Sequence, residues 1–320
     1  MKNKTWYDIF MDALHKKFPK KTLLTKGLMD LLNLEREAVY RRLRKEVVFT
    51  SHEVVKIVSA YGISLDEIAG INTEQFSFQM RQMNYLNPSK SEQVFLKFVI
   101  KSIRELNRFP DSEIMEICNK FPRSILAGFE YLNQFHLFKW KYQYGDETES
   151  TPFAKIKISQ EEKQIVNDYY EAIKHITTTN IILDKKIFEY LVNDISYFCS
   201  IYLITKEEKE LIRKDLMNLL DYWLDVANKG YFPETRNKVN LYISHLNIET
   251  NYSYTFSPEA SISFIAVFEK FEVFSLNTEF VANFMTWMQW KKRTATQISE
   301  VDERSRVEFF TKQRQLIENM

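Results

Sequence analysis

The pattern of apolar positions is clearest near the start of the chain. Between Leu23 and Gly70, two short segments with apolar residues at helical spacing lie on either side of Asn33-Leu34. The first runs from about Thr25 to Leu32, and the second begins at Glu35. Because Asn tolerates the left-handed conformation that ends a helix, the pattern predicts two helices joined by a tight turn, a helix-turn-helix.

The second of these helices, from about Glu35 to Lys45, has two unlike faces. Val39 and Leu43 lie together on the face that we expect to be buried. The opposite face carries polar and charged side chains: Glu37, Tyr40, Arg41 and Arg44, with Arg36 and Lys45 on its flanks. Guanidinium groups suit guanine edges and phosphate oxygens alike, so this face could bind DNA. An ordinary solvated face with a Glu37–Arg41 pair is the alternative interpretation.

Further helices are predicted around this pair. Apolar residues at helical spacing over 6–18 predict a helix that leads into the motif. Thr50-Ser51-His52-Glu53 and Ser64-Leu65-Asp66-Glu67 both have the pattern of a capping box, which marks the start of a helix. The first 71 residues are therefore expected to form a five-helix domain, the head.

Residues 5–71 resemble the XRE family of helix-turn-helix regulators, the phage Cro and repressor type. The resemblance rests on the segments LMDLLNLEREAVYRRL and VVKIVSAYGISLDEIAG. It implies that the helix over 35–45 enters the major groove of double-stranded DNA, with base contacts from Arg36, Glu37 and Arg41. The full set of DNA-contacting residues expected in this way is Thr25, Lys26, Arg36, Glu37, Tyr40, Arg41, Arg44 and Lys45.

Three positions depart from the family pattern. Met29 and Asn33 stand where the family favours a small residue and a Gly at the turn. Arg42 stands where the family favours an apolar residue that packs inward. We expect Arg42 to be partly buried and paired with an acid, either Asp30 or Glu53.

The remainder of the chain predicts a larger α+β domain, the body. Residues 72–90, rich in Gln, Asn, Met and Ser, are the expected linker. Helical patterns follow at about 91–109, 111–122, 123–142, 159–176, 184–204, 205–230, 278–292 and 302–318, and alternating residues between 239 and 274 predict three strands. The expected fold is therefore mainly α, with a small antiparallel sheet in a body over 91–320 and a sub-boundary at 145–152.

Composition and charge narrow the class of protein. The 320 residues are 45% hydrophobic and 27% charged, which excludes disordered and fibrous classes. Residues 1–71 hold 13 Lys and Arg against nine Asp and Glu, and this modest positive excess suits a phosphate-binding head. Cys118 and Cys199 lie in apolar stretches expected to be helical, as free thiols. No secretory signal is visible, and no apolar run approaches the roughly 20 residues of a membrane span, so a cytoplasmic location without membrane contact is expected.

Motifs of catalysis and metal binding are missing from the sequence. None of the five His pairs with another His or Cys at metal-ligand spacing, and there is no Gly-rich phosphate loop. We therefore expect no enzyme and no cofactor, but a sequence-specific DNA-binding transcriptional regulator. The body is expected to form a homodimer, with the apolar helices over about 91–142 and the pair Trp287 and Trp290 as candidate contacts, and could bind an effector. The alternatives are a protein-interaction module whose head has lost DNA binding, and an enzyme with a regulatory head.

Overall fold

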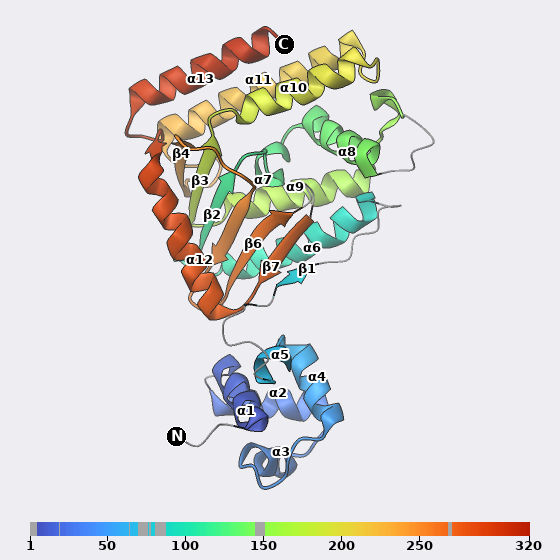
Figure 1. Ribbon diagram of the computed structural model, residues 1–320, viewed down its shortest axis with the longest axis vertical. Coiled ribbons are helices and arrows are strands. Elements are labelled where there is room, and N and C mark those ends of the chain that lie inside the picture. The colour runs from blue at the N-terminus through green and yellow to red at the C-terminus, as the bar shows by residue number, and fades with distance from the viewer. Residues whose placement is uncertain are drawn as a thin grey trace. The chain divides into compact units, whose positions relative to one another are not determined.

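The computed structural model describes residues 5–18, 20–63, 65–69, 76, 78–80, 88–144, 151–267 and 271–320. The chain forms two compact units, the head (Met1–Ser77) and the body (Phe78–Met320), and we keep these two names for them (Figure 1). The capping box predicted at Ser64 lies outside the described residues, as do most of the predicted linker 72–90 and most of the segment 145–152.

The head is helical, as the apolar pattern predicts. Its described helices are α1 (Trp6–Lys17), α2 (Lys21–Leu32), α3 (Arg36–Leu43), α4 (Ser51–Tyr61) and α5 (Leu65–Ile68). Asn33 ends α2 in the left-handed conformation with φ 53°, which confirms the turn expected there. Two helix ends differ from the sequence-based expectation. α2 begins at Lys21 rather than Thr25, and α3 ends at Leu43, because Lys45 has φ 62° and cannot continue a helix.

The core of the head lies between its helices. Phe10, Leu24, Leu28, Val39 and Ile57 are completely inaccessible to solvent, which confirms the inward orientation predicted for Val39. The capping box predicted at the start of α4 is also confirmed, because the Thr50 hydroxyl accepts from the Glu53 amide and the Glu53 carboxylate accepts from the Thr50 amide. Leu43, which was expected to be buried together with Val39, is only partly buried, because it lies at the end of α3.

The body is built on one sheet of eight strands within the described residues, in the order β1-β7-β6-β5-β2-β3-β4-β8. The strands are β1 (Gln79–Met80), β2 (Glu113–Cys118), β3 (Thr178–Asp184), β4 (Lys238–Ser244), β5 (Tyr252–Phe256), β6 (Ser261–Val267), β7 (Phe271–Ser275) and β8 (Ala295–Gln297). β2, β3 and β4 run parallel, and the remaining pairs are antiparallel. The expectation of a small antiparallel sheet is therefore wrong: the sheet is large and mixed.

Two strands that the sequence pattern does not predict, β2 and β3, lie at the centre of the sheet. The pattern predicts a helix over 111–122 with Cys118 in it; instead Cys118 is the last residue of a strand. Both strands are buried on both faces, so their sequences, EIMEIC and TTNIILD, lack the regular alternation that marks a half-exposed strand. Their position inside the sheet explains why the pattern does not reveal them.

Helices cover both faces of the sheet (Figure 1). They are α6 (Pro88–Leu106), α7 (Arg123–Leu126), α8 (Glu130–Tyr144), α9 (Gln160–Lys174), α10 (Ile187–Ser200), α11 (Lys206–Lys229), α12 (Thr278–Lys291) and α13 (Glu303–Glu318), with short 3-10 turns at Phe153–Lys155 and Lys292–Thr294. The single helix expected over 123–142 is two helices, α7 and α8. No helix of the described part of the chain is both long enough and apolar enough to cross a membrane.

The two faces of the sheet contact different helices. Phe284 and Met288 of α12 pack on Met115 of β2 and Tyr254 of β5, on one face. Helices α6 to α11 lie on the opposite face, where α8, α10 and α11 form the largest core with β2, β3 and β4, and α13 packs on α10 and α11. On this second face one row of neighbouring residues crosses six strands: Leu241, Ile181, Glu116, Ser253, Phe264 and Phe274. A carboxylate thus stands in the middle of a largely apolar row.

Candidate functional site

The exposed face of α3 carries most of the residues expected to contact DNA. Val39 is buried on the inner side, and Arg36, Glu37 and Arg41 are exposed on the outer side. Of the other predicted contacts, Lys26, Arg44 and Lys45 are exposed, Tyr40 is half-buried and Thr25 is buried. The Thr25 hydroxyl donates to the Lys21 carbonyl at 2.9 Å, within its own helix. Six of the eight predicted residues are therefore exposed on the surface of the head.

Side chains on this face contact one another as well as solvent. Arg36 Nη2 donates to the Tyr40 hydroxyl at 3.1 Å, and this contact lowers the pKa of Tyr40. Arg44 lies 3.0 Å from Glu37 and 2.7 Å from Glu46, so two carboxylates partly neutralise it. Lys45 forms an ion pair with Asp8 of α1, which fixes the end of α3 on the neighbouring helix. The face is cationic, with carboxylates among its guanidinium groups.

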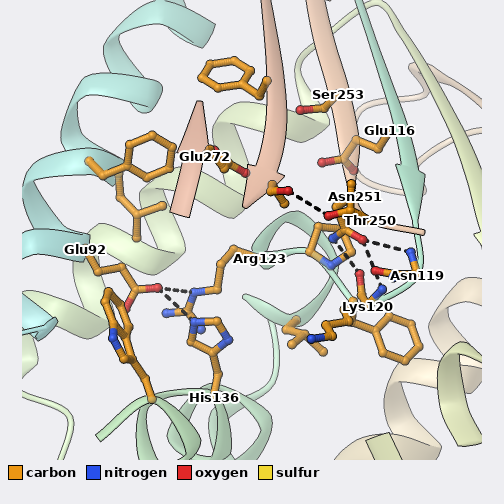
Figure 2. Close-up of a pocket in the computed structure, with 18 of the residues that line it drawn as sticks. Glu92, Glu116, Asn119, Lys120, Arg123, His136, Thr250, Asn251, Ser253 and Glu272 are labelled. Carbon is orange, nitrogen blue, oxygen red and sulfur yellow. Dashed lines mark hydrogen bonds and ion pairs between the residues drawn. The ribbon is translucent and has the colours of Figure 1, made fainter. Parts of the chain in front are cut away.

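The body contains a cavity of about 990 Å³ on the sheet face covered by α6 and α8. It lies over the face of β2, β5, β6 and β7 and extends to the loop that follows β2. Concave, largely apolar cavities with a few polar groups are the usual sites for small molecules. Figure 2 shows its polar lining, which includes Glu116, Ser253 and Glu272.

Two carboxylates of the sheet form the acidic part of this cavity. Glu116 is almost completely buried, and both of its oxygens accept from the single hydroxyl of Ser124, at 2.9 and 2.8 Å. Glu272 lies three strands away on β7, opposite Ala266, and its carboxylate has no hydrogen bond or ion pair to any described residue. Burial raises the pKa of each to about 7, and the charge of Glu116 adds to the effect on Glu272.

A second polar group lies on the helical wall. Arg123 Nε is 2.9 Å from Glu92, and Arg123 Nη1 donates to Asn133 at 2.5 Å. His136 Nε2 lies 3.3 Å from the same Glu92 carboxylate, as Figure 2 shows. Lys139 of α8 forms its own pair with Asp194 at 2.5 Å. The cations Arg123 and Lys139 therefore already have carboxylate partners.

Two loops are held together at the edge of the cavity by one side chain (Figure 2). Asn251 Oδ1 accepts from the backbone amides of Asn119 and Lys120, at 2.9 and 3.1 Å, and Asn251 Nδ2 donates to the Lys120 carbonyl at 2.9 Å. In return, Asn119 donates to the Glu249 carbonyl at 2.8 Å. Every polar atom of the Asn251 amide is thus used to fix the loop after β2 to the segment before β5.

Nothing in the sequence pattern predicts this cavity. Its acids come from segments far apart in the chain, and the pattern predicts a helix where β2 lies, so Glu116 is not expected beside β5 or β7. The available signal was Glu116 between the apolar residues of EIMEIC, and the interruption of the 262–274 run by Glu272. A charge in a buried strand indicates either a partner or a function.

Among the residues that the structure describes, no group of three or more His, Cys, Asp and Glu is placed to hold a metal ion. Comparisons of the chain with protein families, curated proteins and solved structures found no match. Any function must therefore be inferred from the arrangement of the residues themselves.

Proposed function

We propose that this chain is a sequence-specific DNA-binding transcriptional regulator whose head inserts α3 into the major groove of double-stranded DNA. The observation that carries the proposal is the α2–α3 pair. Asn33, in the left-handed conformation, joins the two helices. Val39 packs into the core on the inner side of α3, and Arg36 and Arg41 lie on its outer side. A helix presented in this way, with arginines outward, has the chemistry of direct base readout.

The contacts within α3 divide the roles of the exposed residues. Arg36 and Arg41 are assigned to base edges because neither is held closely by a carboxylate. Arg36 contacts the neutral phenol of Tyr40 on its own helix, and Arg41 lies 3.8 Å from Glu46, farther than a hydrogen bond. Lys26 is assigned to phosphate, since a lysine acts as a point charge. Lys45 would have to leave its ion pair with Asp8 to make such a contact. Arg44 is held between two carboxylates and would have to leave them to contact DNA. Thr25 is buried, and exposure does not support a direct contact from its side chain.

A second candidate function is suggested by the same carboxylates. Glu37 and Glu46 repel phosphate, and a face of mixed charge also suits a protein partner. The head could then be a protein-interaction module that does not bind DNA. The two functions differ in one measurable property, the affinity of the head for DNA.

The proposal also includes the oligomeric state, a two-fold dimer of the chain. A single head of this size contacts few base pairs, and related regulators bind two half-sites about 34 Å apart as two-fold dimers. Trp290 is 55% exposed on α12, whereas Trp287 packs against Tyr252 with ring centroids 4.9 Å apart, so of these two only Trp290 remains a candidate dimer contact, beside the helices over 91–142. Light scattering of the full chain should give twice the chain mass of 38.4 kDa, and a monomer with and without DNA would contradict the dimer.

The test of DNA binding is selection from random double-stranded genomic fragments with the full chain, followed by gel shift on the enriched sequence. Enrichment of one motif is expected. The double variant Arg36→Ala/Arg41→Ala should lose the preference for it. Arg304→Ala, which removes an exposed guanidinium from α13 of the body, is the matched control and should bind as the wild type does. Absence of any enriched motif, with the head folded, would overturn the proposal and favour the protein-interaction module.

A further inference from the structure

We infer that the cavity of the body is a binding site for a small organic cation, an amine or amidine carried on an apolar or aromatic frame, with Glu116 and Glu272 as its counter-charges. The inference concerns the body alone and does not depend on DNA binding by the head. It rests on the shape of the cavity, on the balance of charge inside it and on a buried polar atom without a partner.

The cavity has the size and lining of a small-molecule site. Its volume of about 990 Å³ lies at the upper end of the range for drug-sized ligands. Aromatic rings from both walls line it: Phe95, Phe135, Trp140, Tyr169, Phe264 and Phe274. Aromatic faces attract an alkylammonium or amidinium group through the ring quadrupole, as well as packing on an apolar frame.

Among the described residues, the sheet carboxylates Glu116 and Glu272 lack a cationic partner, whereas none of the lining cations, Lys90, Lys120, Arg123 and Lys139, is without an interaction. Arg123 and Lys139 are each within 3 Å of a carboxylate, so an anionic ligand would have to compete with Glu92 or Asp194 for them. Glu116 has only the Ser124 hydroxyl, and Glu272 has no hydrogen-bond or ion-pair partner in the described part of the chain. A bound cation would supply what both carboxylates lack, whereas a bound anion would add to the repulsion between them.

A buried hydroxyl gives an independent indication of a ligand. Thr255 is 6% exposed, lines the cavity, and its Oγ1 has no hydrogen-bond partner in the structure. Ser253 and Thr255 are two residues apart on β5, so their side chains point to the same face of the sheet. Ser253 lies opposite Glu116 of the neighbouring strand β2. Since an unsatisfied buried hydroxyl is costly, we expect a molecule in the cavity to supply its partner after a rotation of the Thr255 side chain, because Oγ1 itself is covered in this structure.

The test uses three probes that share one ring and differ in charge. Tryptamine carries an ammonium group, tryptophol a neutral hydroxyl and indoleacetate a carboxylate. Isothermal titration calorimetry of the full chain at pH 8 should show tryptamine binding at least about tenfold more tightly than tryptophol, because the ammonium gains charge-assisted hydrogen bonds. Indoleacetate should bind most weakly. Phenethylamine and its alcohol and carboxylate analogues repeat the comparison with a smaller ring.

Substitutions in the cavity test whether the difference in affinity between the probes arises there. Glu116→Gln and Glu272→Gln keep the shape of the side chain, and each should weaken tryptamine about tenfold while leaving tryptophol unchanged. Ala266→Leu places a larger side chain on the sheet beside Glu272, narrows the cavity there and should weaken the binding of both tryptamine and tryptophol. Glu308→Gln, at an exposed position of α13, is the matched control.

Three results would overturn the inference. The first is equal affinity for the amine and the alcohol, the second is tightest binding of indoleacetate, and the third is no binding of either amine up to millimolar concentration. Circular dichroism of each variant shows whether the fold is retained, so that a lost signal can be attributed to the site.

Discussion

Arg42 of α3 forms a two-point ion pair with Glu53 of α4. Its Nε and Nη2 donate to the two carboxylate oxygens at 3.2 and 2.8 Å, and its Nη1 donates to the Ala38 carbonyl at 3.2 Å. The family pattern has an apolar residue at this position, and the sequence led us to expect Asp30 or Glu53 as the partner. The pair with Glu53 confirms that expectation, and it ties α3 to the next helix of the head.

The first prediction is that Arg42→Ala destabilises the head by about 1–3 kcal/mol, because it leaves a largely buried carboxylate without its partner. The side chains of the pair are only 15% and 14% exposed. Hydrogen exchange of the head amides, measured in the full chain, reports the loss. Arg41→Ala, which removes a side chain that is 55% exposed, is the control and should change stability by no more than about 0.5 kcal/mol. Equal effects of the two substitutions would contradict the assigned role of the pair.

The pair also predicts a pH dependence. Burial raises the pKa of Glu53, but the hydrogen bonds from Arg42 and Thr50 outweigh it, and the net pKa is lowered. A carboxyl with a lowered pKa stabilises the fold above its unfolded pKa, and this stabilisation is lost as the pH falls through its folded pKa. Protection of the head amides should therefore fall below about pH 4.5. In Glu53→Gln, the share of this pH-dependent loss of protection that comes from the Glu53 carboxyl should be absent.

The second prediction concerns the orientation of α3. Val39→Asp places an unpaired charge in a completely buried position, and we expect it to unfold the head. Its amides should lose protection while those of the body keep theirs. Tyr40→Phe, one residue along the helix, removes only a hydroxyl from a half-buried ring and should leave the head folded. A folded head in Val39→Asp would mean that α3 is rotated from the orientation described.

The third prediction separates base contacts from phosphate contacts. On the selected DNA site, Arg36→Ala and Arg41→Ala should each cost about 1–3 kcal/mol and relax the preference at one base pair. Lys26→Ala should weaken binding to all sequences alike and reduce the salt slope by about one. Fluorescence anisotropy over a range of salt concentrations measures both quantities. If the Arg variants weaken specific and non-specific DNA equally, these arginines contact phosphate instead.

The fourth prediction concerns the stability of the body. Burial raises the pKa of Glu272 to about 7, from an ordinary value of 4.5, in surroundings that include Glu116 of β2, Tyr169 of α9 and Arg123 of α7. The native state therefore holds this proton more tightly than the unfolded chain does, so the group lowers stability as the pH rises from about 4.5 to 7 and above.

Glu272→Gln should remove this cost. Relative to the wild type, the variant should gain about 1–3 kcal/mol at pH 8 and almost nothing at pH 4. Thermal unfolding of the full chain at both pH values measures the difference, with Glu308→Gln as the control. A gain that is the same at both values would show that ionisation of Glu272 is not its cause.

Sequence patterning is sufficient for the head and insufficient for the sheet of the body. The head consists of short amphipathic helices whose contacts are mostly local, and capping residues such as Thr50 mark their limits. The strands β4 and β5 alternate and were expected. The central strand β2 does not alternate, because helices cover both of its faces, and a run such as EIMEIC cannot be told from a buried helix by its period.

The cavity could not be predicted for a related reason. Glu116, Arg123 and Glu272 are brought together by the strand order, and that order is not encoded in any local pattern. A helix in place of β2 would make Glu116 an ordinary helical acid. The exposed face of α3 was predictable because its residues lie within one short helix.

The hydrogen bonds of the Asn251 side chain to the loop after β2 have a consequence for how the chain folds during synthesis. Its bonds to Asn119 and Lys120 join residues 132 and 131 positions apart, and β5 must be present before β2 has a neighbour on that side. The head, by contrast, is closed by contacts such as that of the Tyr7 hydroxyl with the Phe49 amide, 42 positions apart. Since distant contacts slow folding, we expect the head to fold first as the chain leaves the ribosome. β2 can pair with β3 once residues 178–184 have been made, but its other edge would stay without a neighbour until residues beyond 250 have been made.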